Sequence, residues 1–99
     1  MEMNTKLNGT EFIVELSGRL DTGTAPLLEK QLKESIVGVK KIVIDMKALE
    51  YVSSAGLRVI LSTQKQMNKQ GEMIIMNVND MIMEVFEVTG FIDILNIVN

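Results

Sequence analysis

The run Lys41–Met46, with the sequence KIVIDM, constrains the fold more than any other stretch of the chain. It is nearly continuous in branched apolar residues, and such a run is typical of a central strand covered on both faces. Strands of this kind pair in parallel with helices packed on the sheet. A second run, Glu72–Met76, predicts another buried strand. The two runs together predict an α/β fold.

The segment between these two strands predicts an amphipathic helix that begins after Ser53 and Ser54 and ends at Gly71. Either serine can cap it, because a serine oxygen accepts an N–H of the first helical turn. The apolar face is formed by residues at helical spacing: Leu57, Ile60, Leu61 and Met67. The outer face is expected to carry polar residues: Arg58, Thr63, Gln66 and Lys69.

The first forty residues predict an antiparallel strand pair followed by a helix. Asn8-Gly9 is a two-residue hairpin signal between two short strand-like runs. A helix is expected to begin near Thr24, because Pro26 suits only a first helical turn. Gly38 can adopt the left-handed conformation that ends this helix.

The last twenty residues predict a third helix and a tail. Asn79 or Asp80 can cap this helix, and Gly90 can end it. The helix is rich in methionine, which could fill the core or form a contact surface; we expect it to fill the core. Residues 91–98 could add a short edge strand or pack as an extended segment. The predicted order is β-β-α-β-α-β-α within a single domain, residues 1–99, with a mixed sheet of four to five strands and about three to four helices.

Composition excludes several classes of function. The chain has no Cys and no His, so a disulfide framework, a thiolate metal site and a Ser-His-Asp triad are all impossible. The formal charge of −3 argues against non-specific binding of nucleic acid. No signal peptide and no run long enough to span a membrane is present, and a cytoplasmic protein is expected.

Four polar residues are expected to meet at one end of the sheet. Asp21, Ser53, Ser54 and Asn77 all follow predicted strands, and ligands and partners gather beyond the carboxyl ends of parallel strands. Asp45, which lies in an apolar run, is expected to make a hydrogen bond at the end of its strand.

The chemistry of this group favours a modification switch over catalysis. No phosphate-binding loop and no G-x-S-x-G sequence is present, so we expect neither an enzyme nor a bound cofactor or metal. A phosphate on a serine at a helix N-terminus meets unpaired N–H groups and the positive end of the helix dipole. Phosphorylation there should therefore alter a binding surface and leave the fold intact.

Three blocks of the sequence resemble the STAS domain of small bacterial anti-sigma factor antagonists. They are SGRLD at Ser17–Asp21, KIVIDMKALEYVSSAGLRVIL at Lys41–Leu61 and GEMIIMNVND at Gly71–Asp80. The resemblance covers nearly the whole chain, and its middle block is the most specific. It implies the STAS fold.

The resemblance also implies a partner-switching role. An unphosphorylated antagonist of this family binds a serine-kinase anti-sigma factor, phosphorylation of one serine ends binding, and a PP2C-type phosphatase reverses the step. Aligning Gly56-Leu57 with the family's Gly-Leu places the acceptor at Ser54, with Ser53 as the alternate. Ser53 stands where many members carry Asp. The residues that we expect to bind the partner are Asp21, Ser53, Ser54, Gly56, Leu57 and Arg58.

Alternatives stay open at this point. Asp21 could simply cap the first helix. A STAS accessory subunit of a membrane transport complex, without a phosphorylation cycle, would use the same helix face. A small enzyme or nucleotide-binding domain is a further possibility, and hydrolysis of ATP or GTP by the purified protein that is lost in Ser54→Ala would identify it.

Overall fold

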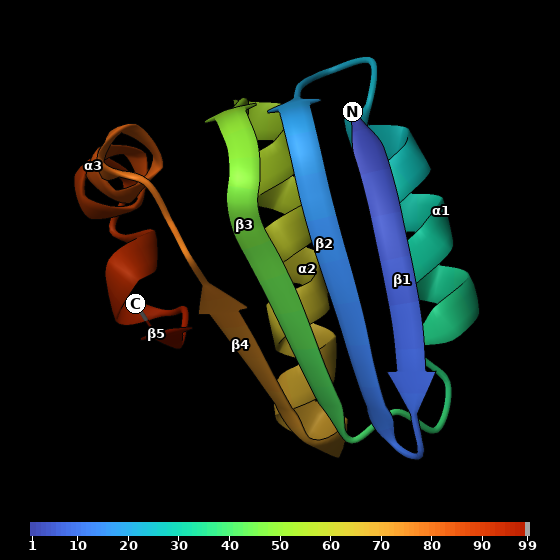
Figure 1. The fold of residues 1–99 in the computed structure, drawn as a ribbon. Coiled ribbons are helices and arrows are strands. Elements are labelled where there is room, and N and C mark those ends of the chain that lie inside the picture. The colour runs from blue at the N-terminus through green and yellow to red at the C-terminus, as the bar shows by residue number, and fades with distance from the viewer. Residues whose placement is uncertain (99) are drawn as a thin grey trace.

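The computed structural model describes residues 1–98, which form a five-stranded sheet, three α-helices and a short 3₁₀ helix (Figure 1). In chain order the elements are β1 (Glu2–Asn8), β2 (Glu11–Leu20), α1 (Ala25–Ser35), β3 (Lys41–Val52), α2 (Ser54–Gln70), β4 (Glu72–Met76), α3 (Asp80–Thr89), η1 (Phe91–Asp93) and β5 (Ile97–Val98). The predicted order is confirmed, and the tail supplies the short edge strand.

The strands lie in the sheet in the order of the sequence, β1-β2-β3-β4-β5. The pair β1 and β2 is antiparallel, and each later strand pairs in parallel with the one before it. This is the predicted mixed sheet with an N-terminal hairpin. The hairpin loop is Gly9-Thr10, one residue later than the Asn8-Gly9 signal, because Asn8 pairs with Glu11.

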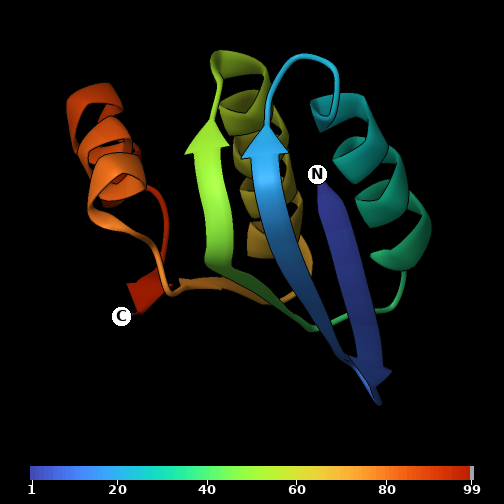
Figure 2. The ribbon, with the colours of Figure 1, turned by 45° about the horizontal axis from the view of Figure 1, so that its top comes forward.

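Helices α1 and α2 cover the same face of the sheet, as two views of the ribbon show (Figures 1 and 2). Ile42, Ile44 and Met46 of β3 are buried beneath them, whereas Val43 and Asp45, which alternate with these, are half-buried on the opposite face. The expectation of a central strand covered on both faces is therefore met on one face only.

Strand β3 is twice as long as its apolar run. It pairs with the ten-residue β2 as far as Val52, and two register shifts keep Leu49 and Val52 on the buried side. Strand β4 pairs only with residues 41–45 of β3. The second half of β3 therefore extends beyond β4, and Asp45 lies inside β3 instead of at its end.

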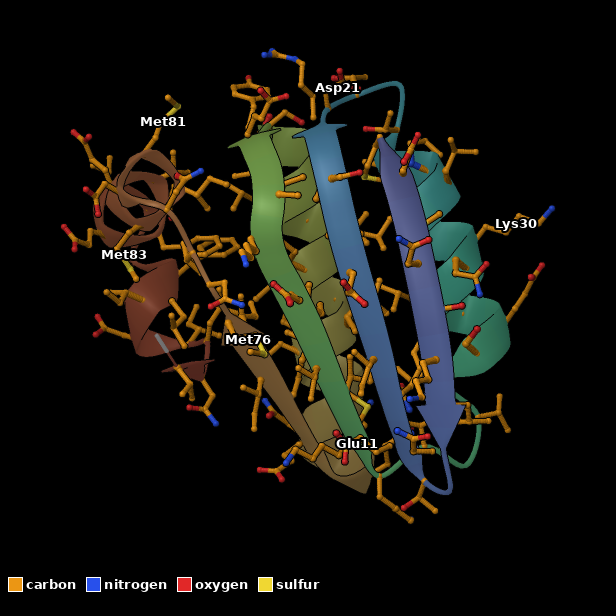
Figure 3. All side chains as sticks on the ribbon, in the orientation of Figure 1. Glu11, Asp21, Lys30, Met76, Met81 and Met83 are labelled. Atoms are coloured by element: carbon orange, nitrogen blue, oxygen red, sulfur yellow. The ribbon has the colours of Figure 1, made fainter. Side chains whose placement is uncertain are left out.

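Helix α3 occupies the space beside this second half of β3 (Figure 1). Its cap is Asn79, whose Oδ1 accepts from Ile82 N at 2.8 Å, while its Nδ2 donates to the carbonyl of Leu49 at 3.0 Å. Ile82 and Phe86 are buried against the sheet. The methionines do not all join the core as expected, because Met81 is 62% exposed and points outward (Figure 3).

Candidate functional site

Strands β2 and β3 end together, and their junction brings two distant segments into contact. The N–H of Ser53 donates to the carbonyl of Leu20 at 2.8 Å. This bond joins the ends of the two strands. Asp21, which follows Leu20, and Ser54, which follows Ser53, therefore lie at the same edge of the sheet. The edge thus carries the turn that leads to α1 and the first turn of α2.

Ser53 is the N-cap of α2, which settles the choice between the two serines. Its extended backbone places its Oγ 3.3 Å from the N–H of Gly56, which donates to it, and its carbonyl accepts from Leu57 N at 2.9 Å. Ser54 is the first helical residue and is exposed, and its hydroxyl has no hydrogen-bond partner within residues 1–98. The structure therefore separates a capping serine from a free one.

Gly56 and Leu57 lie beneath this surface. A Cβ atom on Gly56 would stand 2.7 Å from Cγ of Leu20 and 3.0 Å from Cγ2 of Val52, so the first turn of α2 packs directly on the ends of β2 and β3. Leu57 is 7% exposed. Both residues hold the serines in place, and direct contact of either with a partner stays a prediction.

Asp21 organises the turn between β2 and α1. Its Oδ1 accepts from the N–H of Gly23 at 3.0 Å and from the N–H of Thr24 at 3.1 Å. The hydroxyl of Thr24 accepts from Asp21 N at 2.8 Å, and its own hydrogen is shared between the carbonyl of Arg19 at 2.8 Å and Oδ1 of Asp21 at 3.1 Å. Thr24, not Asp21, is the N-cap of α1, and its own side chain caps no helical N–H. Asp21 therefore stabilises the turn that precedes α1 and is not the cap of the helix.

These bonds hold the pKa of the Asp21 carboxyl below its ordinary value of 3.8. The N–H of Thr24 contributes most, followed by its hydroxyl. Burial opposes the shift, while the N–H of Gly23 and the charge of Arg19 support it. The folded state thus favours the ionised form of this side chain.

We expect the Asp21 carboxylate to stabilise the fold at neutral pH and to lose this effect in acid. A folded-state pKa below that of the unfolded chain gives stability that is present above the unfolded value and is lost as pH falls through the folded value. The free energy of unfolding of Asp21→Asn should therefore depend less on pH than that of the wild type as the pH falls below about 4. Thr24→Val, which removes the hydroxyl and keeps the amide, should lose only part of this dependence. Equal slopes for all three proteins in denaturant titrations would contradict the assignment.

Arg58 lies one helical turn after Ser54 and is exposed beside it. It borders a hollow of about 280 Å³ between α1 and α2, whose other lining residues are Thr22, Ala25, Pro26, Glu29, Ala55 and Val59. Residues four apart on a helix are neighbours. The free hydroxyl, the guanidinium and the mouth of this hollow therefore form one continuous surface.

The prediction for Thr63 is wrong. Thr63 is 6% exposed, and its hydroxyl donates to the carbonyl of Val59 at 2.8 Å. The side of α2 that carries it is covered by α1, which periodicity alone does not reveal. Arg58, Gln66 and Lys69 are exposed as expected.

Asn77 does not join the other predicted site residues. Its Nδ2 donates to Oδ1 of Asp45 at 3.0 Å, and the same oxygen accepts from Lys47 N at 2.9 Å. Because β4 ends level with Asp45, Asn77 lies about seven residues, or about 23 Å, from Ser53 along β3. The difference in length between β4 and β3 therefore separates Asn77 from the serines.

A stacked pair that sequence reasoning missed lies beside the serines. The guanidinium of Arg19 stands 4.2 Å from the ring centre of Tyr51, its partner across the β2–β3 pair. Such contacts are favourable by about 0.5–1 kcal/mol at exposed sites. No sequence signal predicts the pair, since it depends on the register shift before Arg19. Thr24 was missed as well, although its position three residues after Asp21 is typical of a polar turn.

The model of the STAS domain family matches residues 2–99 of the chain. The chain belongs to the STAS domain family. The chain is 36% identical over 89 residues to the anti-sigma F factor antagonist of Paenibacillus polymyxa, covering 87% of this chain and 76% of that protein. It is 29% identical over 98 residues to the anti-sigma-B factor antagonist of Bacillus subtilis, with 98% and 90% covered.

Solved structures agree with this STAS fold. The Bacillus cell fate determinant SpoIIAA in its phosphorylated form superposes with a TM-score of 0.78 at 17% identity, over 99% of this chain and 92% of that one. The chain is thus an α/β STAS domain and a homologue of anti-sigma factor antagonists, which are regulators and not enzymes. No helix of residues 1–98 is both long and apolar enough to cross a membrane.

Proposed function

We propose that this STAS domain is an anti-sigma factor antagonist that switches partners through phosphorylation of Ser54. Unphosphorylated, it binds a serine-kinase anti-sigma factor in the cytoplasm and so frees a sigma factor for transcription. The kinase transfers the γ-phosphoryl group of ATP to Oγ of Ser54, which loses its proton, and ADP leaves. Water then hydrolyses the phosphate ester in a PP2C-type phosphatase and restores the hydroxyl. The domain acts as substrate, not catalyst.

One observation carries this proposal: Ser54 offers a free, exposed hydroxyl at the first position of α2, while Ser53 makes the capping bond. A kinase can reach the Ser54 oxygen without breaking a helix cap. The Ser53 oxygen, by contrast, already accepts the N–H of Gly56, so modification there would disturb the cap of α2. The geometry therefore favours Ser54 as the acceptor and leaves Ser53 as the alternate.

The position also suits a reversible switch. A phosphate adds a charge of about −2 and meets the unpaired N–H groups and positive dipole end of a 17-residue helix. Its effect on the fold is therefore small. The Asp21 carboxylate at the same edge adds to the negative charge that an acidic or closely packed partner would meet.

We infer that the partner contacts the edge built from Asp21, Ser53, Ser54 and Arg58, with Gly56 and Leu57 as its support. Asp21 uses one oxygen for its turn, and every hydrogen bond described for its carboxylate involves that oxygen, Oδ1. Oδ2 is available to a partner. Gln66, farther along α2, is exposed and belongs to the same proposed interface.

Charge reversal by Arg58→Glu is expected to weaken binding of the cognate kinase about tenfold, which corresponds to about 1.4 kcal/mol. The side chain is exposed and makes no described ion pair, so the melting temperature should not change. Lys40→Glu makes the same charge change at the opposite end of the sheet and serves as the control. Equal affinities for the two variants, measured by calorimetry, would remove Arg58 from the interface.

The proposal is tested by incubating the protein with ATP and the serine kinase encoded nearest to it, followed by mapping of phosphate by mass spectrometry. Phosphate on Ser54 with dissociation of the complex is the expected result. Phosphate on Ser53 would overturn the assignment of the acceptor. Absence of phosphate with every candidate kinase would overturn the switch itself.

A further inference from the structure

We propose that the outer face of α3 is a second docking surface, which binds a basic amphipathic helix of a protein partner. This surface goes beyond the switch at Ser54, since neither that residue nor a kinase takes part in it. We call it the α3 face and define it by Met81, Glu84, Val85, Val88 and Thr89, which line one hollow of about 270 Å³.

The α3 face is apolar where a surface helix is ordinarily polar. Ile82 and Phe86 already satisfy the core, being 1% and 0% exposed. Met81, Val85 and Val88 then form a second apolar stripe at spacings of four and three beside this buried face, and Val85, which is half-buried, joins the two. Met81 is 62% exposed and Val88 is 80% exposed. Packing within the domain therefore does not account for Met81 and Val88, the two ends of the stripe.

Helix α3 stands at the margin of the molecule, away from α1 and α2, so no other helix covers the exposed ends of the stripe (Figures 1 and 2). Met81 points outward at one end of the helix (Figure 3). A ten-residue helix is about 15 Å long, which matches three turns of a partner helix. Helix-in-groove binding uses anchors at this spacing.

The charge around the stripe identifies the kind of partner. All ten Lys and Arg residues of the chain lie before residue 70, whereas five of its thirteen acidic residues follow it. Residues 70–99 therefore carry a formal charge of −5, and the rest of the chain carries +2. Glu84 lines the hollow itself, and Asp80 and Glu87 are exposed on the same helix. The charged residues around the stripe are therefore all acidic. A partner helix whose own apolar stripe is flanked by Lys or Arg would be complementary to this surface.

The same charge argues against two other occupants. A second copy of the chain, packed α3 on α3, would place acidic residues against acidic residues, and such juxtaposition is unfavourable. An anionic membrane surface attracts basic segments and would repel this one. A basic helix gains from both the stripe and its surroundings.

The test uses a synthetic helical peptide of about 18 residues with Leu at positions i, i+4 and i+7 and Lys beside them. It is titrated into the ¹⁵N-labelled protein and followed by NMR. We expect shifts that map to residues 80–89 and an affinity that falls as salt rises. Val88→Gln should weaken binding at least tenfold and leave the melting temperature unchanged, because the side chain is exposed. Val37→Gln, at a position that is 85% exposed after α1, is the matched control.

Several results would overturn the proposal. They are shifts that map elsewhere, no measurable binding, or equal loss in Val88→Gln and Val37→Gln. Equal binding of a peptide with Glu in place of Lys would refute the role of charge. Sedimentation that shows a dimer abolished by Val88→Gln would assign the α3 face to a second copy. Binding to phosphatidylglycerol vesicles that the same change abolishes would assign it to a lipid surface.

Discussion

Ser54→Asp is expected to weaken binding of the partner kinase about 100-fold, or by about 2.8 kcal/mol, and to leave the fold intact. The new carboxylate would lie in the proposed interface beside Asp21, where an unpaired or like charge costs several kcal/mol. At the first position of α2 the same charge interacts favourably with the helix dipole, by about 0.3–1 kcal/mol. Affinity should fall while the melting temperature holds or rises slightly.

The matched control for this change is Thr10→Asp. Thr10 is exposed in the hairpin loop at the opposite end of β2, so the net charge changes equally and the proposed interface does not. Calorimetric titration with the kinase and thermal melting should be run on both variants. A lowered melting temperature with unchanged affinity for Ser54→Asp would show that the residue is structural and not part of the interface.

Gly71→Ala is expected to destabilise the protein by about 3 kcal/mol, the upper part of the range for overpacking. A Cβ atom at Gly71 would collide with the carbonyl oxygen, the carbonyl carbon and Cα of Lys40, all of them backbone atoms. Relief requires the start of β4 to move away from the start of β3, where Glu72 N donates to Lys40 O at 3.0 Å. For a chain of this size the melting temperature should fall by about 12 °C or more.

Gly23→Ala controls for the loss of glycine flexibility. A Cβ atom at Gly23 would meet Oδ1 of Asp21 at 3.5 Å, which is an ordinary contact. We expect its free energy of unfolding to stay within about 0.5 kcal/mol of the wild type. If Gly71→Ala melted like Gly23→Ala in urea, the close approach of Gly71 to Lys40 would not be required by the fold.

The sequence predicted the elements well where a local signal was strong. Pro26 correctly marked the first turn of α1, and Gly90 adopts the left-handed conformation that ends α3, with φ of 80°. Gly38 is also left-handed, with φ of 79°, but it lies two residues beyond the end cap of α1 at Ile36. Capping residues and proline act within one helical turn, so their effect can be predicted without knowing which elements pack nearby.

Errors arose where the answer depended on a neighbouring element. The polar residues Lys47 and Glu50 hid the second half of β3, which exists because β2 is long enough to pair with it. Thr63 and Asn77 were misplaced because the cover given by α1 and the short length of β4 set their surroundings. The length over which two strands pair, and the face that a neighbouring helix covers, depend on tertiary packing. The hydrophobic periodicity of the sequence alone does not reveal them.

The candidate site was predictable in part. The predicted order of strands and helices placed Asp21, Ser53 and Ser54 at one edge, and the hydrogen bond from Ser53 N to the carbonyl of Leu20 brings them together. The division of labour between the two serines was not predictable, because adjacent serines are equal candidates for a cap until the backbone is known. The exposed stripe of α3 was the less favoured of two expectations, since methionine fills gaps in a core well.

The arrangement of the sheet in sequence order has a consequence for how the chain folds. Every strand pairs with the strand next to it in sequence, so no pairing has to wait for a later strand, and each parallel pairing closes one crossover that contains a helix. During synthesis the hairpin, β3 and α2 can assemble before α3 and β5 have left the ribosome. The edge that carries Ser54 is then complete when the last thirty residues are added. We expect a C-terminally arrested nascent chain to present this edge early.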